Sequence, residues 1–70
     1  MIWSDASQLA RAGIAIRRAT WPIGKTLVWS AGAGTTRAVP EITQPGGSVG
    51  VVRASEFGQA EFEATDWKQA

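Results

Sequence analysis

The 70-residue chain contains no cysteine and no histidine. Without cysteine it can form neither disulfides nor thiolate metal sites, and without histidine it lacks the commonest zinc ligand and the usual general base. No nucleophile stands beside a base at a recognisable spacing. The sequence therefore predicts a protein that is not an enzyme and that needs no metal and no cofactor.

An excess of charge of one sign is also missing, because seven Lys and Arg face six interspersed Asp and Glu. A strong field that would gather nucleic acid is therefore excluded, and we expect no nucleic-acid partner. No stretch approaches the roughly 20 apolar residues that span a bilayer. The opening "MIWSDASQLARAG" lacks the apolar run of a signal peptide. We expect a soluble, cytoplasmic protein without a membrane partner.

Large aromatic side chains are what the chain has in quantity: four Trp and two Phe. A chain of this length forms one domain, residues 1–70, near the lower limit at which a single core holds a fold. Each enclosed aromatic side chain buries about 150–250 Å². Since neither disulfide nor metal supports the fold, we expect some of this aromatic surface to close against a second subunit in a homo-oligomer.

The first third of the chain shows a helical period followed by a strand period. Residues 5–12 are predicted to be a helix, with Ser4 as its N-cap and Gly13 as its end. Residues 14–19 and 26–30 alternate with a period of two and predict strands.

The remainder is predicted to be extended and interrupted by turns. Pro40 argues against both a helix and a central strand, and "TQPGG" indicates a turn. Strands are expected in 48–55, in a return arm at 59–63, and at the end of 64–70. Together these elements predict an α+β fold, in which one short N-terminal helix packs on a small bent antiparallel sheet of four to five strands.

The stretch "AIRRATW", residues 15–21, holds the first candidate binding residues. Arg17 and Arg18 alternate on a strand, so they cannot share a face. In one interpretation, one arginine faces water and the other pairs with a carboxylate. In the other, the guanidinium of one arginine donates two parallel hydrogen bonds to a phosphate of the ligand. We assign the phosphate to Arg18, which is nearer the turn. Trp21 is either core or interface, or a stacking platform for a base.

A second candidate segment is "AGAGTTR". Walker-type phosphate binding is excluded, since no lysine follows the last glycine and no helix follows the loop. Thr35, Thr36 and Arg37 either donate hydrogen bonds to ribose or phosphate or are simply solvated. Near the end of the chain, Asp66 is expected to cap a turn and Trp67 to fill the core. Asp66 as an acid catalyst has no partner carboxylate at motif spacing.

The order of these pieces resembles the second Thoeris anti-defence family, which are small phage proteins. The resemblance covers roughly the first 30 and the last 10 residues. Three features carry it: a helix that ends in Gly, a strand that bears Arg before a Trp, and a terminal Ala-x-Asp-Trp turn. The matching residues are Leu9, Ala10, Gly13, Ile16, Arg17, Arg18, Trp21, Leu27, Ala64, Asp66 and Trp67. Where family members usually carry a longer polar segment, this chain has only "SEFGQAEFE".

The resemblance implies a homo-oligomer, commonly a tetramer, that sequesters a cyclic nucleotide immune signal without cleaving it. Its ligand would be a cyclic ADP-ribose isomer or a cyclic dinucleotide, in the cytoplasm of an infected bacterial host. The alternative function is a protein–protein inhibitor of a bacterial defence complex, such as an anti-CRISPR protein.

Overall fold

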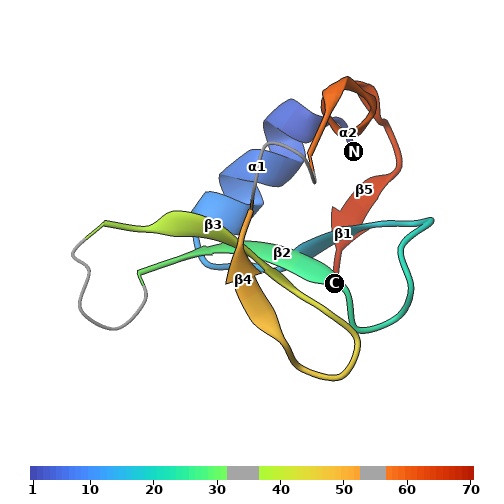
Figure 1. Ribbon diagram of the computed structural model, residues 1–70. Coiled ribbons are helices and arrows are strands. Elements are labelled where there is room, and N and C mark those ends of the chain that lie inside the picture. The colour runs from blue at the N-terminus through green and yellow to red at the C-terminus, as the bar shows by residue number, and fades with distance from the viewer. Residues whose placement is uncertain (32–36, 53–56) are drawn as a thin grey trace.

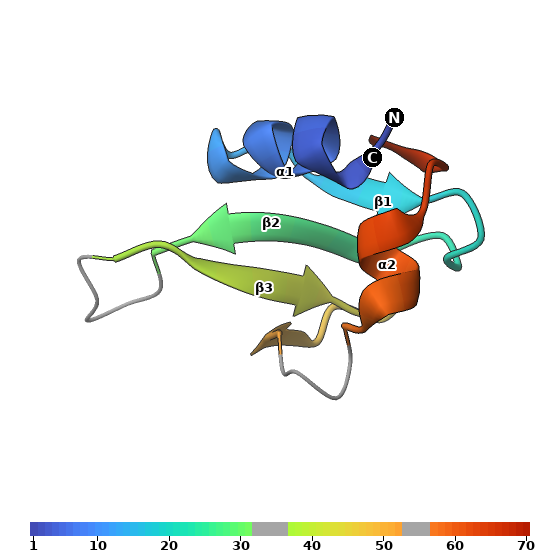
Figure 2. The same cartoon turned by 90° about the horizontal axis from the view of Figure 1, so that it is seen from above.

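The computed structural model describes residues 1–31, 37–52 and 57–70, and in these segments the chain forms two helices and five strands. In chain order they are α1 (Trp3–Arg11), β1 (Ile16–Arg18), β2 (Thr26–Ser30), β3 (Val39–Thr43), β4 (Val49–Val51), α2 (Gln59–Glu63) and β5 (Trp67–Gln69). All strands join one antiparallel sheet in the order β4-β3-β2-β1-β5. Both helices lie on the same side of it (Figures 1 and 2). The predicted α+β class is confirmed, with a second short helix added.

Helix α1 begins two residues earlier than predicted. The backbone carbonyl of Ile2 accepts hydrogen bonds from the N–H groups of Asp5 and Ala6, at 3.2 and 3.0 Å, so Ile2 is the N-cap. Ser4 therefore lies inside the helix, and its prediction as the cap is wrong. The acidic Asp5 still falls in the first turn, where it complements the positive end of the helix dipole.

The predicted strand 14–19 shortens because its first residues are used to end the helix. Gly13 adopts a φ of 93°, and the N–H of Ile14 then donates to the carbonyl of Leu9 at 3.0 Å. This is the Schellman arrangement, which needs a left-handed residue and so favours glycine. Ile14 is left 36% exposed, and the strand starts at Ile16.

Strand β3 corrects the expectation that Pro40 excludes a central strand. Pro40 stands opposite Trp29 of β2, and its carbonyl accepts the N–H of Val52 at 3.0 Å on the other side. In a strand, the carbonyl and the amide position of one residue point the same way, so the missing N–H of Pro40 faces β4. The proline therefore removes no bond to β2, and its missing N–H falls at the end of the pairing with β4, one residue beyond the last ladder pair, Glu41 and Val51.

The segment 59–63, predicted to be a return strand, is helix α2. Its start is fixed by the Glu61 carboxylate, which accepts the backbone N–H of Gly58 at 2.8 Å. One turn on, the Gln59 amide donates to the Glu63 carboxylate at 2.7 Å. These local bonds, made by residues of high helix propensity, favour the helix over a strand.

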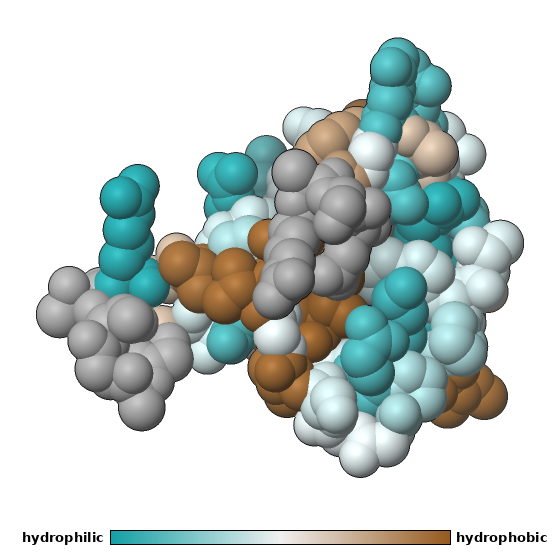
Figure 3. Space-filling model, viewed as in Figure 1, coloured by the Kyte–Doolittle hydropathy of each residue, from teal (hydrophilic) through white to brown (hydrophobic). Residues whose placement is uncertain are grey.

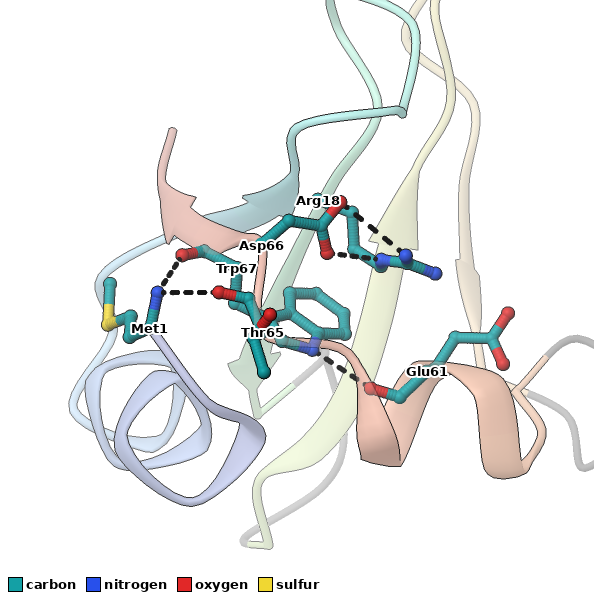
Figure 4. Close-up of polar contacts among 6 residues, drawn as sticks. All are labelled: Met1, Arg18, Glu61, Thr65, Asp66 and Trp67. Atoms are coloured by element: carbon teal, nitrogen blue, oxygen red, sulfur yellow. Dashed lines mark hydrogen bonds and ion pairs between the residues drawn. The ribbon is translucent and has the colours of Figure 1, made fainter.

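The core lies between the helices and the sheet, and Trp67 is its largest fully buried side chain, at 1% exposure. Its indole Nε1–H donates to the carbonyl of Glu61 at 2.9 Å, which attaches α2 to β5 (Figure 4). The α-amino group of Met1 donates to the carbonyl of Trp67 at 2.6 Å. The prediction that Trp67 fills the core is confirmed. The other buried apolar residues are Ala6, Ala10, Ile16, Leu27 and Ile42.

Candidate binding site

The turn between β1 and β2, residues 19–25, carries a half-buried tryptophan with a cation over its ring. The ammonium of Lys25 lies 4.7 Å from the centroid of the Trp21 ring. Trp21 also packs edge-on against the buried Trp67, with 5.3 Å between centroids and 80° between planes. The backbone of the turn is held by Trp21 N–H to Arg18 O at 3.0 Å and by Lys25 N–H to Pro22 O at 3.1 Å. One end of the indole therefore touches the core, while the turn presents the other to solvent.

Arg18 is paired with a carboxylate from the other end of the chain. Its Nε donates to Oδ1 of Asp66 at 2.8 Å, and its Nη2 donates to Oδ2 at 3.4 Å. The third guanidinium nitrogen points away from Asp66 (Figure 4). The side chains of Arg18 and Asp66 are 20% and 31% exposed. The carboxylate of Asp66 therefore pairs with Arg18, an interaction that we did not predict for Asp66.

The hydrogen bond from Arg18 lowers the pKa of Asp66 below its usual value. The positive charge of the guanidinium acts in the same direction, while burial opposes both. Asp66 consequently remains a carboxylate at neutral pH and cannot act there as a proton donor.

Arg17 points to the opposite face of the sheet from Arg18, as the strand alternation predicts. Its Nη2 donates to the backbone carbonyl of Trp21. The Nε of Arg17 is buried and has no hydrogen-bond partner within the part of the chain that the structure describes. Lys68 stands opposite Arg17 in β5. Arg17 thus holds the Trp21 turn from behind and adds positive charge to that face.

The second predicted segment is separated from the first by the length of β2. Thr35 and Thr36 lie outside the described residues. Arg37 is exposed and lies shortly before Val39, which pairs with Ser30 at the far end of β2. The Trp21 turn precedes the near end of β2. The structure thus brings Arg17, Arg18 and Trp21 together and leaves Arg37 at the opposite end of the strand.

Sequence reasoning missed an apolar pocket of about 350 Å³ between the two helices and the sheet. Trp3 is its centre, with ring centroids of Phe57 at 5.1 Å, Phe62 at 5.5 Å and Trp29 at 6.2 Å. The guanidinium of Arg11 lies over Trp29, 5.2 Å from its centroid. The seven residues that line this aromatic pocket are Trp3, Leu27, Trp29, Pro40, Val52, Phe57 and Phe62.

Apolar side chains are also exposed outside the aromatic pocket, and Val49 and Val51 lie on the opposite face of the sheet from it. Figure 3 shows hydrophobic residues gathered over β3 and β4 in this view. Phe62, Val49 and Val51 are each more than half exposed. The aromatic content was the one sequence signal for the aromatic pocket. Its position could not be predicted, because Phe62 was expected on a return strand at 59–63 but lies on α2, and Phe57 was assigned to no element.

No family model, curated protein or solved structure matches the chain.

Among the described residues, no group of three or more acidic side chains is placed to hold a metal ion. None of the helices in those segments is long and apolar enough to cross a membrane. The Trp21 turn combines a ring with nearby cations, and the aromatic pocket provides a shape without charge. The first suits a planar anionic ligand, and the second suits an apolar side chain.

Proposed function

We propose that the protein is a phage-type anti-defence protein that sequesters a cyclic nucleotide immune signal, a cyclic ADP-ribose isomer or a cyclic dinucleotide, without cleaving it. The observation that carries the proposal is the Lys25 ammonium over the ring of the half-buried Trp21. A base and a phosphate in one ligand need an aromatic face and a cation within a few ångströms of each other.

Each residue of the turn has a distinct part in this proposal. The base stacks on Trp21, and Lys25 moves off the ring to pair with a phosphate, which its flexible stem allows at little cost. Arg18 adds a charge-assisted hydrogen bond through the guanidinium nitrogen that points away from Asp66. Arg17 is a positioning residue, since its bond to the Trp21 carbonyl fixes the turn.

Capture without chemistry is supported by the composition of the chain, which has no histidine and no cysteine. A sequestering protein acts by lowering the free concentration of its ligand. It therefore needs high affinity and enough binding sites, but no catalytic group. We place the protein in the cytoplasm of an infected bacterium, as a homo-oligomer, a tetramer, that encloses the ligand between its subunits.

Calorimetric titration with a cyclic ADP-ribose isomer and with a cyclic dinucleotide tests the proposal. Trp21→Ala is expected to cost about 1–3 kcal/mol of binding free energy if a base stacks there. Arg18→Ala and Lys25→Ala are each expected to cost about 1.5–3 kcal/mol, the range for hydrogen bonds to charged groups. Arg11→Ala removes the equivalent cation over Trp29 and serves as the matched control.

Asp66→Asn separates a phosphate role of Arg18 from a purely structural one. The neutral amide competes less for the guanidinium, so binding is expected to hold or to tighten. Ligand recovered from the complex should have an unchanged mass. If Trp21→Ala, Arg18→Ala and Lys25→Ala all bind as the parent does, the Trp21 turn is not the site.

A protein–protein inhibitor of a defence complex, such as an anti-CRISPR protein, is the alternative, and one observation favours it. Strand β4 is an edge of the sheet with Val49 and Val51 58% and 55% exposed. An exposed edge strand can pair with a strand of another protein. In that case Val51→Lys would abolish inhibition of the target complex, whereas Trp21→Ala would leave it intact.

A further inference from the structure

The most exposed large apolar side chain of the described residues is at the tip of the β1–β2 turn. Ile23 is 89% exposed, between Pro22 and Gly24. It adds nothing to the core of its own subunit. Such a residue on a projecting turn is a candidate anchor for an interface, because enclosing it removes apolar surface from water.

The same chain carries a recess that matches this side chain. The aromatic pocket has a volume of about 350 Å³, and its lining is almost entirely apolar. A ligand with hydrogen-bonding groups would find few partners there, whereas an aliphatic side chain needs none. Phe62, at the mouth, is still 51% exposed.

The charges beside the two features are complementary. Lys25 lies two residues after Ile23, and the 19–25 turn contains no acid. Phe62 lies between Glu61 and Glu63, and the helix 59–63 contains no base. Among the residues that the structure describes, Arg11 is a cation at the pocket, and it lies over Trp29 on the α1 side. A turn bearing Lys25 is therefore attracted to the α2 wall of the aromatic pocket.

From this match we infer that the aromatic pocket is filled by the Ile23 turn of a second copy of this chain, with Lys25 beside Glu63 of the partner subunit. Every copy has both features, so the contact is reciprocal in a closed dimer, in which two Ile23 side chains fill two pockets. This interface rests on exposure, cavity shape and charge. Lys25 also belongs to the proposed ligand site, so association is measured without ligand and either proposal can fail alone.

Sedimentation velocity over a micromolar range, without any ligand, measures the contact. Ile23→Asp is expected to raise the dissociation constant at least about tenfold, since buried anchor residues dominate interface affinity. Ile23→Leu keeps an aliphatic side chain and is expected to associate as the parent does. Phe62→Gln removes part of the pocket wall, and Ile2→Gln is its matched control, because both residues are 51% exposed and Ile2 does not line the aromatic pocket.

Two further experiments distinguish this contact from a general loss of apolar surface. Lys25→Glu and Glu63→Lys are each expected to weaken association, and the double variant is expected to recover it. A mixture of Ile23→Asp and Phe62→Gln should form a heterodimer, since one intact Ile23 turn then meets one intact pocket. Circular dichroism confirms that each variant is folded.

The inference is overturned if the parent remains a monomer at a protein concentration on the order of 100 µM. It is equally overturned if Ile23→Asp associates as tightly as the parent, or if the charge-swapped double variant is no better than either single variant. If the parent associates but binds neither cyclic nucleotide, the result counts against the Trp21 proposal alone.

Discussion

The guanidinium of Arg18 binds the carboxylate of Asp66 across the β1–β5 pair, with 2.8 Å between Nε and Oδ1. Arg18 stands directly opposite Trp67 in the strand register. The ion pair therefore lies beside Trp67, which fills the core, and it helps to hold β5 against β1.

The ion pair predicts a dependence of stability on pH. Because Arg18 lowers the pKa of Asp66 in the folded state, the unfolded state binds more protons as the pH falls. The contribution of Asp66 to stability is complete above the unfolded pKa of about 3.9 and is lost as the pH falls through the lower folded pKa. Urea denaturation between pH 2 and pH 6, on the order of one point per half unit, measures this loss.

Asp66→Asn should remove that part of the acid dependence, and Arg18→Gln should remove the same part. The double variant should behave as either single variant does, since the two residues form one interaction. An acid dependence that persists undiminished in Asp66→Asn would show that other carboxylates cause it.

The buried tryptophan is expected to contribute the largest single share of packing energy. Trp67→Ala leaves a cavity and removes the bond from the indole to Glu61, so it should lower the free energy of unfolding by about 3–5 kcal/mol. Trp67→Phe keeps most of the packing but lacks the N–H, and it should be less harmful. Chemical denaturation gives both values, and an unchanged midpoint for Trp67→Ala would contradict the placement of this side chain.

The left-handed glycine after α1 should resist substitution. Gly13→Ala meets no atom within 4 Å, so its cost is purely conformational, about 1–2 kcal/mol. Gly50→Ala is the matched control, because Gly50 also has open space around it but a φ outside the left-handed region. Thermal denaturation of the two variants should show a loss for Gly13→Ala only. Equal melting temperatures would mean that α1 does not need this C-cap.

Local sequence patterns were sufficient where local bonds decide the structure. The strand 26–30 was predicted with its observed bounds, and Gly13 was recognised as the end of the helix. The same reasoning failed at Pro40, because a proline is tolerated where its missing N–H faces away from β2 and falls at the end of the pairing with β4. Nothing in the residues around Pro40 reveals where that pairing ends.

The candidate site shows the same division between local and long-range interactions. Trp21 and the two arginines were predicted as site residues from one short stretch of sequence. The partner of Arg18, Asp66, is 48 positions away and was not predicted. The aromatic pocket joins Trp3 to Phe57 and Phe62, which no periodicity connects. Phe62 reaches the aromatic pocket because segment 59–63 is a helix. The start of this helix, α2, is fixed by the hydrogen bond from the Gly58 N–H to the Glu61 carboxylate.

The position of β5 has a consequence for the order in which the chain folds. Strand β1 lies between β2, its neighbour in sequence, and β5, which is synthesised after the other four strands. Until Trp67 emerges from the ribosome, Ile16 and the apolar face of α1 lack their largest packing partner. Closing this contact over most of the chain length is entropically costly, so it should limit the folding rate. Nascent chains that end before Trp67 are expected to remain sensitive to proteases, and addition of the final strand should make them resistant in one cooperative step.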